Sequence, residues 1–329
     1  MARHVVTQLA ENRALARLLG VRGVHLKLEN QQASGSFKDR GMLKLSETLR
    51  LRGVHKIVSS SGGNAGKSAA YCARTLGMRA HVVVPETTSE FMRHIIEGEG
   101  ADVEVHGANW NAADLRARQI VAENPAKCGY APPFDHPLLW EGHSSLVDEL
   151  VEQWPHQEPP DAIAVSVGGG GLLAGVLGGL AQHGWDASTR VLAAETLGAG
   201  SLHRAMAQQA LARLDRISSI ASSLGALQVC EQALIQALSH RAGVDTVLVS
   251  DEMAVQGCKE FADLARILVE PACGTALAAA RQHLAKDPCA EAKRIILVVC
   301  GGSDISLARL SEYADQAAER QTHGVLTSV

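Results

Sequence analysis

Short apolar runs rich in β-branched residues alternate with segments of helical periodicity along most of the 329 residues. This alternation predicts parallel strands joined by crossover helices, and therefore an α/β fold with parallel-rich sheets flanked by helices. Strands are expected at Val24–Leu28, Lys56–Ser59, Ala80–Pro85, Val103–His106, Ala162–Val167, Val191–Ala194, Thr246–Val249 and Ile295–Val299. Helices are expected after Lys38, Ala65, Ser89 and Ala112, and at Ile305–Ala318. Because ligands of open α/β sheets bind beyond the carboxyl ends of the strands, the turns there should form one active face.

The bulk composition excludes several classes of protein. The net charge is −4 and no block of basic residues occurs, so neither nucleic acid nor a membrane surface is an expected partner. Apolar runs end well before the roughly 18 residues of a membrane span, and the N-terminus lacks a signal-peptide core, so a cytoplasmic protein with a small-molecule partner is expected. Seven scattered cysteines and fourteen histidines show no disulfide or metal-site spacing, which predicts reduced thiols and no catalytic metal.

One lysine stands in an unusual setting. Lys38 follows the turn Ser34-Gly35-Ser36 and Phe37, where the strand Val24–Leu28 gives way to a helical pattern. The positive end of a helix dipole disfavours an ammonium, and so does burial, so the pKa of Lys38 is predicted to fall. A free amine can form a Schiff base, which makes Lys38 a candidate nucleophile. The ordinary alternative is a solvated surface lysine.

A first turn of small residues, Ser59 to Gly66, follows the second strand. Such a turn offers an anion a nest of backbone N–H groups. The ordinary alternative is a turn in which Asn64 caps a helix at Ala65–Leu76.

A second turn is the tetraglycine Gly168–Gly171, which follows the strand Ala162–Val167 and is predicted to cradle a phosphate. The same stretch also satisfies a relaxed dinucleotide fingerprint, through Gly169, Gly171 and Ala174. Glu195 lies about twenty residues further on, where a ribose-binding acid would stand. A NAD-binding oxidoreductase is therefore an alternative, although it leaves the lysine turn unexplained.

Together the motifs resemble the pyridoxal-phosphate enzymes of the tryptophan-synthase β-subunit class, and most closely the L-serine dehydratase/L-threonine deaminase family. The resemblance covers nearly the whole chain through five further segments, which are Pro132–Pro137 with Trp140–His143, Ser166–Leu173, Glu195–Ala199, Ile267–Gly274 and Val299–Ser303. It implies two lobes. Residues 1–36 and 137–329 would form a large cofactor-binding domain, and residues 37–136 an inserted small domain with the lysine and the substrate-carboxylate loop.

The resemblance also implies roles for individual residues. Lys38 would carry pyridoxal 5'-phosphate, and the other cofactor contacts would be Phe37 at the ring, Asn64 at the 3'-oxygen, Gly168, Gly169, Gly170 and Gly171 at the phosphate, and Cys300 at the pyridine nitrogen. The substrate carboxylate would be bound by Ser61, Gly62 and Asn64. A monovalent cation, expected to be potassium, would lie among Glu195, Ala199, Ser201, Leu224 and Ala226, largely on backbone carbonyls. The ordinary alternative for Glu195 is a cap on the following turn.

The implied reaction is β-elimination of L-serine to pyruvate and ammonia, and of L-threonine to 2-oxobutanoate and ammonia, by a homodimer. A thiol at Cys300 cannot stabilise a pyridinium as a carboxylate would, which favours elimination. Threonine synthase is an alternative because Gly35–Gly41 resembles its lysine motif, but no extra cationic cluster for a phosphorylated substrate stands out. A serine racemase is another alternative. Gly62 argues against it, because that family carries at this position a serine that reprotonates the opposite face of the substrate. The missing side chain of Gly62 would also leave space beside the substrate.

Overall fold

The computed structural model describes residues 4–326, and within them ten strands form two sheets. The larger sheet has the order β1-β2-β10-β7-β8-β9, with β1 (Leu9–Glu11), β2 (Gly23–Leu28), β7 (Ala162–Ser166), β8 (Arg190–Thr196), β9 (Val244–Val249) and β10 (Arg294–Val299). The smaller sheet has the order β5-β4-β3-β6, with β3 (Lys56–Ser59), β4 (Arg79–Val84), β5 (Ala101–Val105) and β6 (Cys128–Ala131). Every pairing is parallel except that of β1 with β2, so the predicted α/β class is confirmed.

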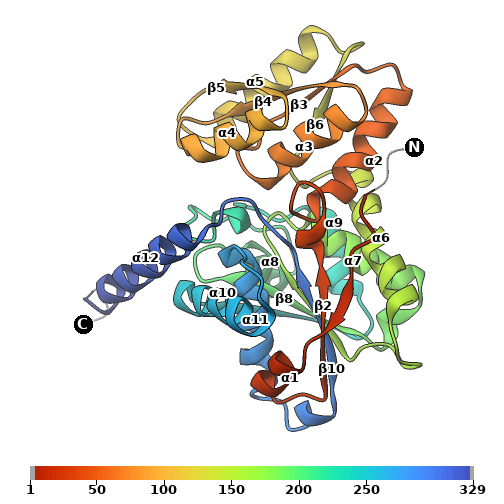
Figure 1. Cartoon of the computed structure of the whole chain (residues 1–329), viewed down its shortest axis with the longest axis vertical. Coiled ribbons are helices and arrows are strands. Elements are labelled where there is room, and N and C mark those ends of the chain that lie inside the picture. The colour runs from red at the N-terminus through yellow and green to blue at the C-terminus, as the bar shows by residue number, and fades with distance from the viewer. Residues whose placement is uncertain (1–3, 327–329) are drawn as a thin grey trace.

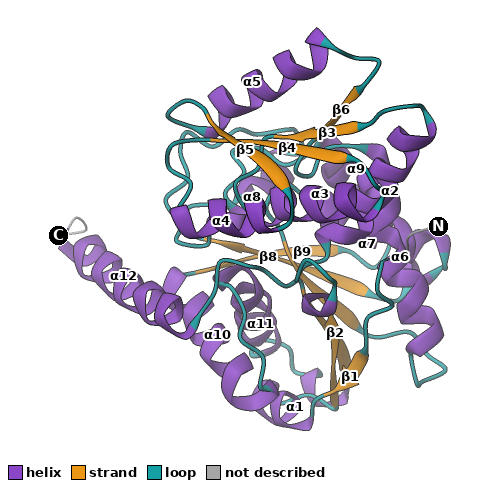
Figure 2. Cartoon of the chain, turned by 45° about the horizontal axis from the view of Figure 1, so that its top comes forward, coloured by secondary structure: helices purple, strands orange, loops and turns teal. Residues whose placement is uncertain are grey.

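Helices cover both sheets (Figures 1 and 2). Those of the first half are α1 (Arg13–Leu19), α2 (Lys38–Leu51), α3 (Asn64–Thr75), α4 (Glu90–Gly98), α5 (Trp110–Glu123) and α6 (Pro137–Gln153). Those of the second half are α7 (Gly171–Gln182), α8 (Ser201–Gln208), α9 (Glu231–Ser239), α10 (Asp251–Ala265), α11 (Pro271–Leu284) and α12 (Leu307–Leu326). None of the helices in residues 4–326 is long and apolar enough to span a membrane.

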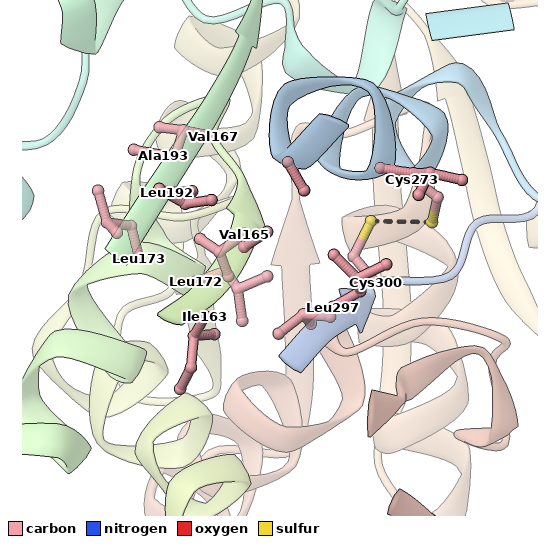
Figure 3. Close-up of a cluster of buried hydrophobic side chains, with 14 of the residues drawn as sticks. Ile163, Val165, Val167, Leu172, Leu173, Leu192, Ala193, Cys273, Leu297 and Cys300 are labelled. Atoms are coloured by element: carbon pink, nitrogen blue, oxygen red, sulfur yellow. Dashed lines mark hydrogen bonds between the residues drawn. The ribbon is translucent and has the colours of Figure 1, made fainter. Parts of the chain in front are cut away.

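The smaller sheet is buried on both faces. Because side chains alternate along each strand, neighbouring residues pack against helices on opposite faces. Ile57 and Val82 pack with apolar residues of α2 and α3, whereas Val58 and Val83 pack with residues of α5. In the larger sheet, Ile163 of β7 and Leu297 of β10 are fully buried in a cluster that also holds the start of α7 (Figure 3). The helices therefore fix both sheets and leave the turns at the strand ends to line a site.

Two strands were not predicted from the sequence, and several helices begin at other residues than expected. β1 has three residues and β6 contains Cys128 and Gly129, so neither shows the β-branched run on which the prediction relied; each is held by pairing at a sheet edge. α3 begins at Asn64 and not at Ala65, α5 begins at Trp110 and not after Ala112, and α12 begins at Leu307 and continues to Leu326. Figure 1 shows α12 extending away from the body of the protein. The domain boundaries at residues 36/37 and 136/137 stay a prediction.

The sheets bring distant turns together. The loop before α2 and the end of β10 meet in a bridge between Ser36 and Gly301. The turns after β2, β3, β7 and β10 therefore lie near one another, as expected for the carboxyl ends of strands.

Candidate active site

A cavity of about 930 Å³ lies at these turns. Its wall includes most of the residues singled out from the sequence, namely Phe37, Lys38, Ser61, Gly62, Asn64, Gly168, Gly169, Gly170, Gly171, Leu224, Ala226 and Cys300. Glu195, Ala199 and Ser201 are not among its lining residues. This volume is near the upper end of the roughly 300–1,000 Å³ typical of small-molecule sites.

Lys38 is the first residue of α2 and its amine is held inside the cavity wall. Its Nζ donates a hydrogen bond to the carbonyl oxygen of Pro133 at 2.6 Å and lies 4.9 Å from the centre of the Phe37 ring. Burial lowers the pKa of Lys38 from 10.5 to about 8, and the thiols of Cys300 and Cys230 offset this only in part. The amine is therefore far closer to its free-base form at neutral pH than an ordinary lysine.

The turn that presents Lys38 is fixed by Asp39. Its carboxylate accepts hydrogen bonds from the backbone N–H of Ser34 at 2.8 Å and from the hydroxyls of Ser34 and Ser68. The ring of Phe37 meets that of His143 edge to face, with 5.0 Å between centroids. The hydrogen bonds of Asp39 therefore fix the turn before Lys38, and the contact with His143 orients the ring of Phe37.

The tetraglycine joins β7 to α7. Among the described residues, the N–H groups of Gly168–Gly171 donate no hydrogen bond to a protein acceptor. Gly170 has φ +85°, which favours glycine, and a Cβ at Gly169 would overlap the ring of Phe134. A helix N-terminus with free N–H groups is suited to bind an anion of phosphate size.

The side chain of Asn64 is oriented by two contacts. Its Oδ1 accepts from the N–H of Ser303 at 2.9 Å, and its Nδ2 lies 3.2 Å from both carboxylate oxygens of Glu270. Lys67, one turn later, donates to the Ser303 hydroxyl at 3.1 Å, so it contacts the loop after β10. The amide of Asn64 thus has a defined direction in the cavity wall.

Sequence reasoning gave no role to Glu270, which lines the cavity and is 3% exposed. Burial raises the pKa of its carboxyl, against hydrogen bonds from Asp304, Ser223 and Asn64. The only signal in the sequence was its place in the segment Ile267–Gly274, because the contacts of a buried carboxyl with distant segments leave no local pattern.

The structure corrects one expectation about Gly62. A Cβ at this position would overlap the side chain of Thr88, which also lines the cavity. The space beside Gly62 is therefore filled by the side chain of Thr88, a cavity residue that sequence reasoning missed.

All seven cysteines are free in the structure. Cys300 lies at the end of β10 in the cavity wall, and its Sγ is 3.1 Å from the Sγ of Cys273 on α11 (Figure 3). Both side chains are buried. Cys300 is thus placed where a bound ligand can contact it, whereas Cys273 is not.

The residues of the expected cation site come from two segments of the chain. Glu195 near the end of β8, Ala199 in the following turn and Ser201 at the start of α8 are buried, whereas Leu224 and Ala226 line the cavity. The Glu195 carboxylate accepts from the N–H groups of Leu202 at 2.8 Å and His203 at 2.7 Å, so it caps α8. Burial raises its pKa to about 8. Both oxygens are occupied, which leaves Glu195 poorly suited to bind a ribose.

Charged side chains are balanced in the cavity wall. Tertiary structure brings Arg213 and Arg216 there, although neither stood out in the sequence. The lining side chains of positive sign are Lys38, Arg213, Arg216 and Arg309, and those of negative sign are Asp135, Asp215, Glu270 and Asp304. The wall therefore has no cationic excess for a phosphorylated substrate. Within the described part of the chain, no group of three or more His, Cys, Asp or Glu residues could hold a metal ion.

Comparison with known proteins gives concordant matches. Residues 3–301 match the family model described as pyridoxal-phosphate dependent enzyme. The chain is 42% identical over 320 residues to the L-serine dehydratase/L-threonine deaminase of Homo sapiens, covering 95% of each chain. The crystal structure of an L-serine ammonia-lyase from Rhizomucor miehei matches with a TM-score of 0.87 and 38% identity, covering 95% of this chain and 99% of that one. A serine racemase from Dictyostelium discoideum matches with a TM-score of 0.80 and 27% identity, over 92% and 94% of the chains.

Proposed function

Because this chain belongs to the pyridoxal-phosphate dependent enzymes, and among them to the L-serine dehydratase/L-threonine deaminase family, we propose that it eliminates water from L-serine. The enamine product, 2-aminoacrylate, would then take up one water and yield pyruvate and ammonia. L-threonine would give 2-oxobutanoate and ammonia. The observation that carries the proposal is that one cavity holds both the low-pKa amine of Lys38 and the unpaired N–H groups of Gly168–Gly171.

The residues present fit the cofactor. Gly168–Gly171 offer free N–H groups to a phosphate, Lys38 offers a nucleophilic amine, and Cys300 offers a sulfur side chain to a pyridine nitrogen. Asn64 keeps one N–H for an oxygen of the ring. When bound, pyridoxal phosphate supplies an electron-withdrawing ring that stabilises negative charge at the substrate Cα.

The protein groups would divide the remaining work. Lys38 would hold the cofactor covalently and, once released by the substrate amine, would take the proton from Cα as general base. Ser61 and the neighbouring backbone N–H groups would bind the substrate carboxylate, which aligns Cα with Lys38. Phe37 and Phe134 would exclude water from that side of the cavity.

A potassium ion near Glu195, Ala199, Ser201, Leu224 and Ala226 is part of the proposal. Among the described residues, the buried Oγ of Ser201 has no hydrogen-bond partner, which supports an unfilled ligand position in the turn before α8. The cap that Glu195 forms on α8 accounts equally for that residue. The homodimer and the cytoplasmic location implied by the resemblance stay predictions.

The proposal is tested with the purified protein and the variants Lys38→Ala and Lys56→Ala. Wild type should release ammonia from L-serine and L-threonine but not act on O-phosphohomoserine, and should show the visible absorption of the bound cofactor. Lys38→Ala should lose both properties. Lys56→Ala is the control, because Lys56 lies at the opposite end of β3. Turnover by Lys38→Ala, or activity with O-phosphohomoserine alone, would refute the assignment.

A further inference from the structure

Glu270 is a buried carboxyl to which the proposed reaction gives no role. It stands at the N-cap of α11, where a Ser, Thr, Asp or Asn side chain would accept a hydrogen bond from the first N–H groups of the helix. Glu270 forms no such cap bond. Its side chain turns instead toward the cavity, which it lines while remaining 3% exposed.

The Glu270 carboxylate accepts hydrogen bonds from three other segments. Oε1 accepts from the backbone N–H of Asp304 at 2.9 Å, and Oε2 accepts from the hydroxyl of Ser223 at 2.8 Å. Asn64 Nδ2 is 3.2 Å from both oxygens. Gly302 allows this approach, because a Cβ there would overlap the carboxyl group. Every partner is a donor, so the carboxylate acts only as an acceptor.

These bonds determine what two cavity residues can offer a ligand. Asn64 cannot turn its amide around, because Ser303 N–H donates to its oxygen while Glu270 takes its nitrogen. Its NH₂ has two hydrogens, so one remains for the cavity. Ser223 has a single hydroxyl hydrogen, which Glu270 takes, so the hydroxyl presents lone pairs to the cavity.

We propose that Glu270 is a positioning residue that fixes Asn64 as a hydrogen-bond donor and Ser223 as a hydrogen-bond acceptor toward the contents of the cavity. The N–H of Asn64 thereby favours a ligand that presents a hydrogen-bond acceptor, such as the oxygen of the cofactor ring. The oxygen of Ser223 favours a ligand that presents a hydrogen-bond donor, such as the hydroxyl or ammonium group of an amino acid. The assignment of these two ligands rests on the proposed function, whereas the direction of the hydrogen bonds does not.

The variant Glu270→Gln isolates this role, since it keeps the shape but replaces one acceptor by an NH₂ group. Of the partners, only the Ser223 hydroxyl can rotate and accept from that group, so its hydrogen turns into the cavity. We expect a thermal midpoint close to that of wild type and a loss of about 10- to 100-fold in kcat/KM for L-serine. Glu260→Gln is the matched control, because Glu260 is a buried carboxyl on α10 that pairs with Arg281 outside the cavity.

A double-mutant cycle shows whether Glu270 acts through Ser223. Ser223→Ala should cost about as much as Glu270→Gln, and the double variant should cost little more than either. Fully additive losses, or an unchanged kcat/KM in Glu270→Gln, would overturn the proposal.

A measurement without turnover separates this inference from the proposed function. The apoprotein of Glu270→Ala, in which Asn64 loses its partner, should bind pyridoxal phosphate about tenfold more weakly by fluorescence titration, and Asn64→Ala should do the same. If wild type were inactive on L-serine, the proposed function would fail while this titration still tested the role of Glu270. Unchanged affinity in Glu270→Ala would contradict that role.

Discussion

Replacing Arg40 by methionine should destabilise the protein strongly, because its guanidinium holds two buried carboxylates. Its Nε and Nη2 each lie 2.7 Å from an oxygen of Glu29, and Nη1 and Nη2 lie 2.7 and 2.8 Å from the oxygens of Glu149. Lys27 Nζ is 2.6 Å from Glu149. The side chains of Arg40, Lys27 and Glu29 have no exposed surface, and that of Glu149 is 7% exposed.

The magnitude follows from the charges left behind. Two cations and two carboxylates balance in wild type, whereas Arg40→Met leaves two carboxylates with Lys27 alone. Removing one partner of a buried ion pair costs about 3–5 kcal/mol. Since a domain is stable by about 5–15 kcal/mol, the variant should lose a large part of its free energy of unfolding.

The loss should depend on pH. Burial raises the pKa of Glu149, but hydrogen bonds from His4, Arg40 and Lys27 outweigh it and hold that pKa well below its ordinary value of 4.5. A depressed carboxyl pKa contributes stability above the ordinary value, and this is lost as the pH falls toward the folded one. The deficit of Arg40→Met should therefore be largest near neutral pH and shrink below about pH 4.5.

Urea unfolding of the apoprotein measures this effect. The double variant Arg40→Met/Glu149→Gln removes one cation and one carboxylate, so it should regain at least half of the lost free energy. A loss below about 1 kcal/mol in the single variant, or no recovery in the double one, would refute the reasoning.

Four further predictions concern the cavity and the cation. Because burial lowers the pKa of Lys38 to about 8, uptake of pyridoxal phosphate by the apoprotein should speed up about tenfold per pH unit and level off above about pH 8; a rise continuing to pH 10 would contradict this. Ammonia release should fall after dialysis against a large organic cation, and potassium should restore it better than sodium. Glu195→Gln should raise the half-saturating potassium concentration. Equal rates in both salts would count against the cation site. Chiral chromatography of the wild-type reaction should find little D-serine, and abundant D-serine would indicate a racemase. Gly62→Ser should lose activity because its side chain overlaps Thr88, and the added change Thr88→Ala should restore part of that activity. Cys300→Asp should add a long-wavelength absorption band and slow elimination, whereas Cys300→Ser should be mild; an unchanged spectrum and rate would exclude a place for the thiol beside the ring.

The sequence by itself determined the features that depend on neighbours along the chain. Alternating apolar periodicity predicted the α/β class, and the strands that it missed, β1 and β6, are short edge strands whose pairing is decided by the sheet. The turns at Lys38, Asn64 and Gly168–Gly171 were visible because serine, glycine and asparagine have local backbone and capping preferences.

Only the tertiary structure decided which groups meet. Asn64 and Glu270 are 206 residues apart in the sequence, yet they share a hydrogen bond because the turn after β3 and the loop between α10 and α11 meet at the cavity. In the same way Thr88 fills the space beside Gly62, and Arg213 enters the cavity wall. Such contacts depend on how the two sheets and their helices pack. This packing is determined by the burial of many apolar side chains throughout the core, and the few residues that meet at the cavity contribute little to it.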